Sequence, residues 1–317
     1  MPEASREDAA DQETLRDALA RGNVALARIG PILSHLLAAP DHSLFSDEIV
    51  ARIRGMCQHL AWQVLRAQAE AAGQAGREAF AERHGEALAE HLLSGPALLA
   101  HCHALALEWQ LTEKLEIQYG IDPVLSPLIQ ELIAAEDDGL ASAAMASLTA
   151  QARFSQTQRR MELPLGELPG DLFHDLLMDW RAFGGHLRSD AMIRAEAKLR
   201  NAYDEGAGRI ALLSRVVGGM GNDVQRALDI DQAGAPLFLT AMAARTGQSR
   251  VAAVLSTNQE QTARLALGLR AAGLDSSEVE RQVLRLDPKA LPPREIAGMP
   301  PEDARRLLAE AAIAGGA

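Results

Sequence analysis

Apolar residues between positions 97 and 119 follow two helical faces at once. Both faces keep the three-and-four spacing of an α-helix. Because the two stripes begin on roughly opposite faces, we predict a central, mostly buried helix over 97–119. Its charged residues, from Glu108 onward, indicate that only part of its C-terminal half faces water. One stripe comprises Ala100, Ala104, Leu107, Leu111 and Leu115, and the other comprises Leu98, Cys102, Leu105 and Trp109.

The same periodicity predicts helices on either side of this stretch. The clearest begins at Ser46, which is a favourable N-cap residue. An N-terminal helix over 5–21 is expected to end at Gly22 and Asn23, a pair that suits a left-handed cap. Further helices are expected over 24–38, 80–93, 124–135, 137–159 and 171–183.

A segment rich in proline and glycine, Met161 to Gly170, interrupts this series of helices. Such a composition is typical of a domain boundary, although the leucines of this segment indicate that it packs against the protein. We therefore divide the chain into an N-terminal helical bundle, 1–165, and a C-terminal helical domain, 166–317. The two can also pack as one unit.

A long helix is expected over 190–217, because its apolar residues nearly follow a heptad. The simpler interpretation is one amphipathic helix on the core of its own domain. The alternative is a coiled-coil seam that forms a homodimer through helix 190–217. The seam residues are Met192, Leu199, Tyr203, Ile210, Leu213 and Val217.

Beyond residue 221 the expected helices become short and closely spaced, as in the antiparallel hairpins of a helical array. No fixed repeat period is evident. The fold class is therefore all-α, a multi-helical bundle followed by a helical-repeat-like array. The short helices are expected over 223–230, 236–246, 249–255, 259–272, 276–286 and 301–312.

Composition supports this fold class and excludes several functions. The chain has 317 residues, 48% of them hydrophobic but only 3% aromatic, and alanine and leucine, both strong helix formers, are abundant. Its net charge of -12 opposes binding to nucleic acid and to anionic membranes. A polar N-terminus, two cysteines and no apolar run of membrane-spanning length lead us to expect a soluble, cytoplasmic protein of bacterial type.

Metal-binding residue types occur at His101, Cys102 and His103, and again at Cys57 and His59. Helical residues two apart point about 200° apart, so His101 and His103 cannot share one ion. A site would need one residue from each group together with carboxylates. We predict no metal site and no cofactor, and we expect buried thiols that act as small hydrophobic groups.

The glycine-rich stretch from Gly218 to Gly221 lacks the features of a phosphate-binding loop. A helix and not a strand precedes it, and no Gly-Lys-Ser/Thr follows. We expect these glycines to end one helix before Asn222 or Asp223 caps the next. The motifs of serine hydrolases and of zinc proteases are also absent, so we predict no catalytic residues.

Residues 240–255 resemble a helix-turn-helix, with Ala243 and Gly247 at the usual spacing. Two features oppose this interpretation. Gln248 stands where an apolar residue normally packs between the helices, and the second helix offers only Arg250 as a basic group. DNA binding through 240–255 is therefore a disfavoured hypothesis.

Basic residues also gather between positions 181 and 200, where they alternate with acidic residues. Mixed charge of this kind is typical of a solvated face and not of an anion-binding patch. The basic residues are Arg181, Arg188, Arg194, Lys198 and Arg200, and the acidic ones are Asp179, Asp190 and Glu196.

Several blocks of the last two-thirds of the chain resemble a family of helical alphaproteobacterial proteins of unknown function, some with HEAT-like repeats. The resemblance implies a helical-repeat-like fold and no catalytic activity, and the use of alanine and arginine is typical of a high-GC bacterium. The blocks are 125–135, 151–154, 159–165, 168–174, 236–243 and 247–255.

Three functions remain after these exclusions. The first is a non-enzymatic protein-interaction or regulatory module whose helical surface binds another protein. The second is a small-ligand or metal-binding protein, enzymatic or not, with a pocket beside helix 97–119 that uses His101, His103 or Glu108. The third is a DNA-binding regulator that acts through 240–255.

Overall fold

The computed structural model describes residues 12–27, 47–74, 76–184 and 190–314, and all regular structure in these ranges is helical. The prediction of an all-α, multi-helical fold is confirmed. No helix within the described ranges combines the length and apolar character that a membrane crossing requires. The predicted helix over 24–38 lies outside the described residues except at 24–27.

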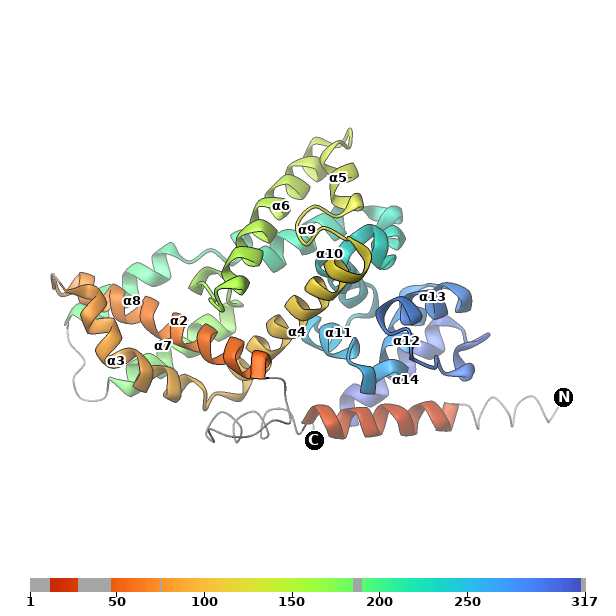
Figure 1. Cartoon of the computed structure of the whole chain (residues 1–317), viewed down its shortest axis with the longest axis horizontal. Helices are drawn as coiled ribbons and strands as arrows, with labels where there is room; N and C mark the ends of the chain where they lie inside the picture. Colours follow the sequence, from red (N-terminus) through yellow and green to blue (C-terminus); the bar gives the residue numbers. More distant parts are fainter. Residues whose placement is uncertain (1–11, 28–46, 75, 185–189, 315–317) are drawn as a thin grey trace. The chain divides into compact units, whose positions relative to one another are not determined.

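Figure 1 shows the order of the helices along the chain. An N-terminal helix covers 12–27. The α-helices that follow are α2 (Asp47–Ala71), α3 (Arg77–Leu92), α4 (Pro96–Tyr119), α5 (Pro127–Ile133), α6 (Asp138–Arg159), α7 (Gly170–Phe183), α8 (Asp190–Ala202), α9 (Arg209–Gly219), α10 (Ile230–Thr246), α11 (Arg250–Ser256), α12 (Thr262–Ala272), α13 (Ser276–Leu286) and α14 (Pro301–Ala314). Short 3-10 helices are η1 (Leu165–Glu167), η2 (Glu205–Ala207), η3 (Gly221–Leu228), η4 (Gln259–Gln261) and η5 (Arg294–Ile296).

Two compact units make up the chain, and each is assembled from separated stretches of sequence. Unit 1 comprises Met1–Ile29, Gln110–Ala144 and Leu213–Ala317, and unit 2 comprises Gly30–Trp109 and Met145–Leu212. The boundary expected between 165 and 166 therefore lies inside unit 2. The physical reason is that Leu163, Leu165 and Leu168 are all buried, so the Pro/Gly-rich segment forms part of a core.

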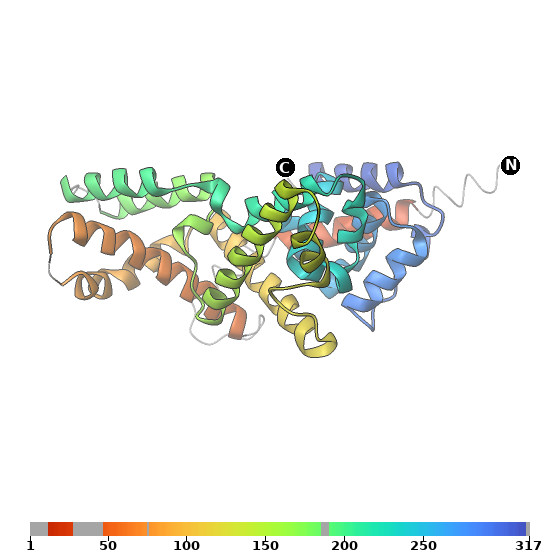
Figure 2. The ribbon, with the colours of Figure 1, turned by 90° about the horizontal axis from the view of Figure 1, so that it is seen from above.

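In unit 2, α2 packs along α3 and α8, and α3 packs along α7. Figure 2 shows α7 and α8 as one layer over the hairpin of α2 and α3. Ile53, Met56 and Leu60 of α2 are completely buried, as a regular apolar stripe requires. Gly85 lets α3 approach Trp62, because a Cβ atom there would lie 2.4 Å from the indole ring.

The prediction of a mostly buried helix over 97–119 is confirmed by α4. Within unit 2, the residues from 101 to 106 are all buried, and so are Glu108 and Trp109. The position of Glu108 differs from the expectation, since its side chain is fully buried and does not face water. An ion pair inside the protein, described below, makes this burial possible.

In unit 1, the N-terminal helix lies beside α12, and α12 packs against α14, α13 and α10. Leu15 and Leu19 of the N-terminal helix are buried. The expected helix end at Gly22 is wrong, because the helix continues to residue 27. The glycine instead allows close packing, since its carbonyl accepts a hydrogen bond from Gln261 and a Cβ atom would collide with that side chain.

The expected continuous helix over 190–217 is also wrong. The chain leaves the helical path after α8, forms η2 and begins α9 at Arg209. Asp204 caps η2 by accepting a hydrogen bond from the backbone of Gly206 at 2.9 Å, and Gly208 is extended. This break divides the heptad pattern, so a coiled-coil homodimer through helix 190–217 has no continuous seam.

The glycine-rich stretch ends one helix as expected, but the expected cap at Asn222 or Asp223 is wrong, because both residues lie inside η3 and Met220 precedes it without a side-chain cap. Gly219 ends α9, and Gly221, with φ of 54°, begins η3. The turn therefore separates two helices, and no strand precedes it in the described chain.

Candidate functional site

Glu108 and Arg209 form an ion pair in the interior of unit 2. The Arg209 guanidinium donates to both carboxylate oxygens of Glu108, at 2.7 and 3.0 Å, and it also donates to Gln151 at 3.2 Å. The exposed fractions of the two charged side chains are only 1% and 0%. A pair with this bidentate geometry can offset the loss of hydration that burial imposes on both charges.

Three helices position this pair. Glu108 projects from α4, Gln151 projects from α6, and Arg209 is the first residue of α9. The Arg209 guanidinium also lies 3.6 Å from the centre of the Phe154 ring, which adds a cation–π contact. The backbone N–H of Arg209 donates to Glu167 at 2.9 Å. The ion pair thus fixes α6 and the segment before α7 at the start of α9.

A cavity of about 440 Å³ lies against this cluster, with Phe154 and Glu167 among its lining residues. One wall is the exposed face of α6, and the other walls come from the segment after α6 and from the turns around η2. The lining residues are Arg153, Phe154, Gln156 and Thr157 of α6, Arg160, Pro164, Gly166 and Glu167 of the following segment, and Ala202, Asp204 and Ala207 near η2.

The charged groups of this cavity differ in whether they already have partners within the protein. Glu167 accepts the N–H of Arg209, and Asp204 accepts the N–H of Gly206. Arg160 lies 3.4 Å from Glu162 with most of its side chain exposed. Among the residues that the structure describes, Arg153 has neither an ion pair nor a hydrogen bond from its side chain.

The histidines proposed for a pocket beside helix 97–119 do not line this cavity. His101 and His103 are both buried in α4, and neither they nor Glu108 belong to its walls. Burial lowers the pKa of His103 to about 4, so its imidazole is neutral at neutral pH. These residues are part of the core around α4, and Glu108 reaches the cavity only through Arg209 and Phe154.

The two cysteines are brought together, although the flanking histidines do not join them. Cys57 of α2 and Cys102 of α4 are buried free thiols. A hydrogen bond with Cys57, together with burial, raises the pKa of the Cys102 thiol well above its usual value. Within the described ranges, no group of His, Cys, Asp and Glu side chains is arranged to hold a metal ion.

The segment 240–255 contains two helices joined by a tight turn. Gly247 has φ of 68°, and Ser249 caps α11 by accepting a hydrogen bond from Ala252. Arg250 is its expected DNA-binding cation, but Arg250 donates to the Thr240 hydroxyl at 3.2 Å. The helix that would enter a groove of DNA is therefore short, with its basic side chain directed to α10.

The basic residues between 181 and 200 engage acidic or carbonyl oxygens in the protein. Arg181 and Arg200 both pair with Glu196, and Lys198 pairs with Glu70 at 2.8 Å. Arg194 donates to the carbonyl of Ala71. Arg188 lies outside the described residues. These pairings agree with a solvated face of mixed charge.

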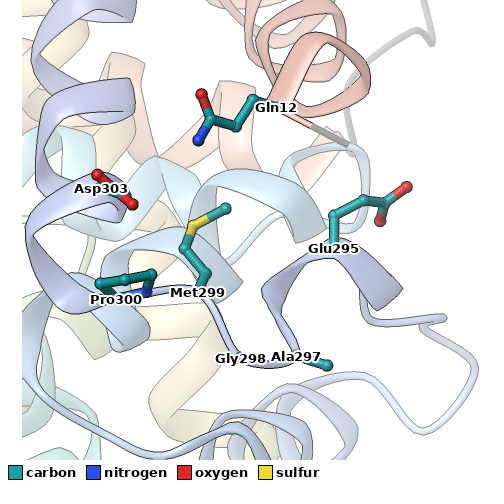
Figure 3. Close-up of a pocket in the computed structure, with 7 residues that line it drawn as sticks. All are labelled: Gln12, Glu295, Ala297, Gly298, Met299, Pro300 and Asp303. Carbon is teal, nitrogen blue, oxygen red and sulfur yellow. The ribbon is translucent and has the colours of Figure 1, made fainter. Parts of the chain in front are cut away.

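A second cavity, of about 390 Å³, lies in unit 1 between the N-terminal helix and the start of α14. Figure 3 shows the Met299 thioether below the Gln12 amide, with the Asp303 carboxylate to the left of both. Glu295 extends away from them in the same view. Asp303 is engaged by Arg306 at 2.7 Å, so this acidic group already has a cation.

Comparisons with known protein families, with curated proteins and with solved structures find no match to this chain. The site therefore rests on its own geometry. Analysis of the sequence missed Arg209, Phe154 and Arg153. The one available signal was Glu108 itself, a carboxylate between the apolar stripes of a helix, which requires a buried cation when that helix has neighbours on both sides.

Proposed function

We propose that this protein is a non-enzymatic interaction module whose helical surface binds another protein. Its membership of the helical alphaproteobacterial family and its cytoplasmic location are part of the same proposal. The observation that carries the proposal is a contrast within unit 2. Deeply buried charges such as Glu108 and Arg209 are used for internal pairing, while large apolar side chains remain on the outer face of α7 and α8.

This outer face, which we term the α7–α8 face, is defined by Met178, Arg181, Ile193 and Arg200, and the buried carboxylate of Glu196 pairs with both of its arginines. Arg181 connects the two helices by pairing with Glu196 and contacts the sulfur of Met178 at 3.6 Å. Ile193 lies one turn before Glu196 on α8. Met178 and Ile193 are 42% and 48% exposed, respectively. Exposed apolar groups with a polar rim are typical of protein-interaction surfaces.

The charges of the α7–α8 face give it a fixed form. Burial alone would raise the pKa of Glu196, but hydrogen bonds from Arg200 and Arg181 outweigh this effect and hold the pKa below its usual value. The carboxylate stays ionised and keeps both arginines in place. A surface with fixed side chains loses less conformational entropy when it binds a partner.

The experiment is quantitative capture of partners with the full-length chain from the cells that naturally produce it. The Met178→Glu, Ile193→Glu double variant places two carboxylates on the face and is expected to lose at least nine-tenths of any reproducible partner. The Met145→Glu variant is the matched control, because Met145 of α6 is also 48% exposed. Equal capture by all three proteins, or no reproducible partner of the unaltered chain, would overturn the proposal.

A second candidate function is the binding of a small ligand. The cavity beside the Glu108–Arg209 pair favours it, because 440 Å³ lies within the range of about 300–1,000 Å³ typical of ligand sites. His101 and His103, which were expected at such a pocket, do not support this function, because both are buried in α4 and neither lines the cavity.

A further inference from the structure

The cavity beside α6 contains cationic groups that the protein itself leaves available. Arg153 belongs to α6, and Arg160 directly follows Arg159, the last residue of that helix. Both line the cavity. In the described chain, Arg153 has no acidic partner, and Arg160 has only the longer contact with Glu162.

The carboxylates of the cavity do not neutralise these arginines. Glu167 is held by the backbone N–H of Arg209 at the first turn of α9, and Asp204 is held by the N–H of Gly206. In each case a carboxylate oxygen faces a backbone donor, which is a favourable arrangement for an ionised carboxylate. Neither acid forms an ion pair with Arg153 or Arg160 within the described residues.

Small residues keep the space in front of the arginines open. A Cβ atom built at Gly166 would meet nothing within 4 Å. Ala202 and Ala207 also line the cavity, with side chains of one carbon. Phe154 and Pro164 add apolar surface to the walls. Together these walls suit a compact apolar body that carries a charged group.

We propose that this cavity binds a small organic anion, with its carboxylate or phosphate group at Arg153 and Arg160 and its apolar body against Phe154 and Pro164. Guanidinium groups recognise both anions by paired, charge-assisted hydrogen bonds. The site is independent of the α7–α8 face, so it goes beyond the proposed partner binding.

The wall behind the ligand is held by the buried ion pair. Phe154 stacks on Arg209, which Glu108 and Gln151 fix from the interior. Glu167 is tied to the backbone of the same arginine. The cavity therefore has a preorganised wall on the side opposite the solvent, which reduces the entropic cost of binding.

The test is isothermal titration of the full-length chain with benzoate, phenyl phosphate and benzyl alcohol. The two anions distinguish a carboxylate from a phosphate site, and the alcohol is their neutral counterpart. We expect one anion to bind and the alcohol to bind at least tenfold more weakly. Absence of binding by both anions, or equal binding of the alcohol, would overturn the proposal.

Three variants then locate the site. Arg153→Gln removes the available cation and is expected to weaken anion binding by about tenfold or more. Gly166→Leu fills the open space without altering a charge and should also weaken it. Arg305→Gln removes an exposed arginine from α14 in unit 1 and should leave affinity unchanged. Unchanged affinity in both of the first two variants, or an equal loss in all three, would assign the anion to another place and refute the site.

Discussion

Arg209 donates two hydrogen bonds to Glu108 across the core of unit 2, between residues that are 101 positions apart in the sequence. The pair connects the middle of α4 to the first turn of α9, and the stacked Phe154 connects both to α6. This relationship explains how a charged residue can occupy a buried position of the central helix. It also supplies the rear wall of the cavity beside α6.

Removal of one partner should destabilise the protein strongly. Glu108→Gln leaves the Arg209 charge buried without a carboxylate, and we expect a loss of about 3–5 kcal/mol in the free energy of unfolding. Denaturation in urea, followed by circular dichroism, measures this loss. The matched control is Glu131→Gln, which breaks an exposed pair with Arg226 and should cost less than about 1 kcal/mol.

Replacement of both charges by apolar residues should be less harmful than either single change. The double variant Glu108→Leu, Arg209→Met removes both desolvation costs and keeps similar volumes. We expect its free energy of unfolding to exceed that of Glu108→Gln. A double variant that is less stable than either single variant would show that the charges are needed for more than mutual neutralisation.

Two glycine substitutions should have opposite effects on stability. The first glycine lies where α2 packs closely against the turn after α6, and the second has open space around it. A Cβ atom at Gly55 would lie 2.7 Å from the Met161 carbonyl oxygen, a backbone atom that cannot rotate away. Gly55→Ala should therefore cost about 1–3 kcal/mol of stability.

Gly218→Ala is the matched substitution, because a Cβ atom at that position of α9 meets nothing within 4 Å. It should stabilise the protein by about 0.5–1 kcal/mol, the ordinary advantage of alanine over glycine in a helix. Thermal unfolding of both variants checks the pair. Equal effects of the two substitutions would contradict the described packing of α2.

Stability should decline as the pH falls from about 6.5 toward 4, in part because of His103. Its folded-state pKa of about 4 lies below the usual value of 6.5, so the unfolded chain takes up the proton first. The stability that depends on a neutral His103 is complete above pH 6.5 and is lost on acidification.

The variant His103→Leu separates this effect from those of the carboxylates. Between pH 7 and pH 5, it should lose about 2 kcal/mol less stability than the unaltered chain. Urea denaturation at the two pH values measures the difference. Parallel losses in both proteins would mean that His103 binds its proton in the folded state.

DNA should not bind appreciably to the helices of residues 240–255. The net charge is -12, and Arg250 is hydrogen-bonded to Thr240 within the protein. Non-specific affinity is greatest at low salt, so an electrophoretic shift assay with bulk DNA at about 20 mM salt is the most permissive measurement. A salt-sensitive shift that Arg250→Gln abolishes would restore the hypothesis of a DNA-binding regulator.

Local features of the fold could be predicted from the sequence. The apolar periodicity that follows Ser46 identified α2, and the double stripe of 97–119 identified α4, because helical periodicity is a property of neighbouring residues. The break after α8 also had local signals in Asp204, Gly206 and Gly208, but a nearly regular heptad obscured them.

Long-range features could not be predicted in the same way. Nothing near Glu108 in the sequence indicates that its partner is Arg209, and no local pattern reveals that each unit combines separated stretches of chain. The cavity also depends on contacts between residues that are far apart in the sequence, since α6, the segment after it and η2 supply its walls. The position of Glu108 between two apolar stripes was the only sign of the site in the sequence.

Native mass spectrometry of the untagged full-length chain, isolated gently from the cells that naturally produce it, tests partner binding most directly. One spectrum reports the chain, any bound polypeptide and any retained small mass. We expect a species in which the chain is joined to a second, different polypeptide and which the Met178→Glu, Ile193→Glu variant does not form. A spectrum that contains only the chain by itself, or the chain with a small added mass, would contradict the proposed function.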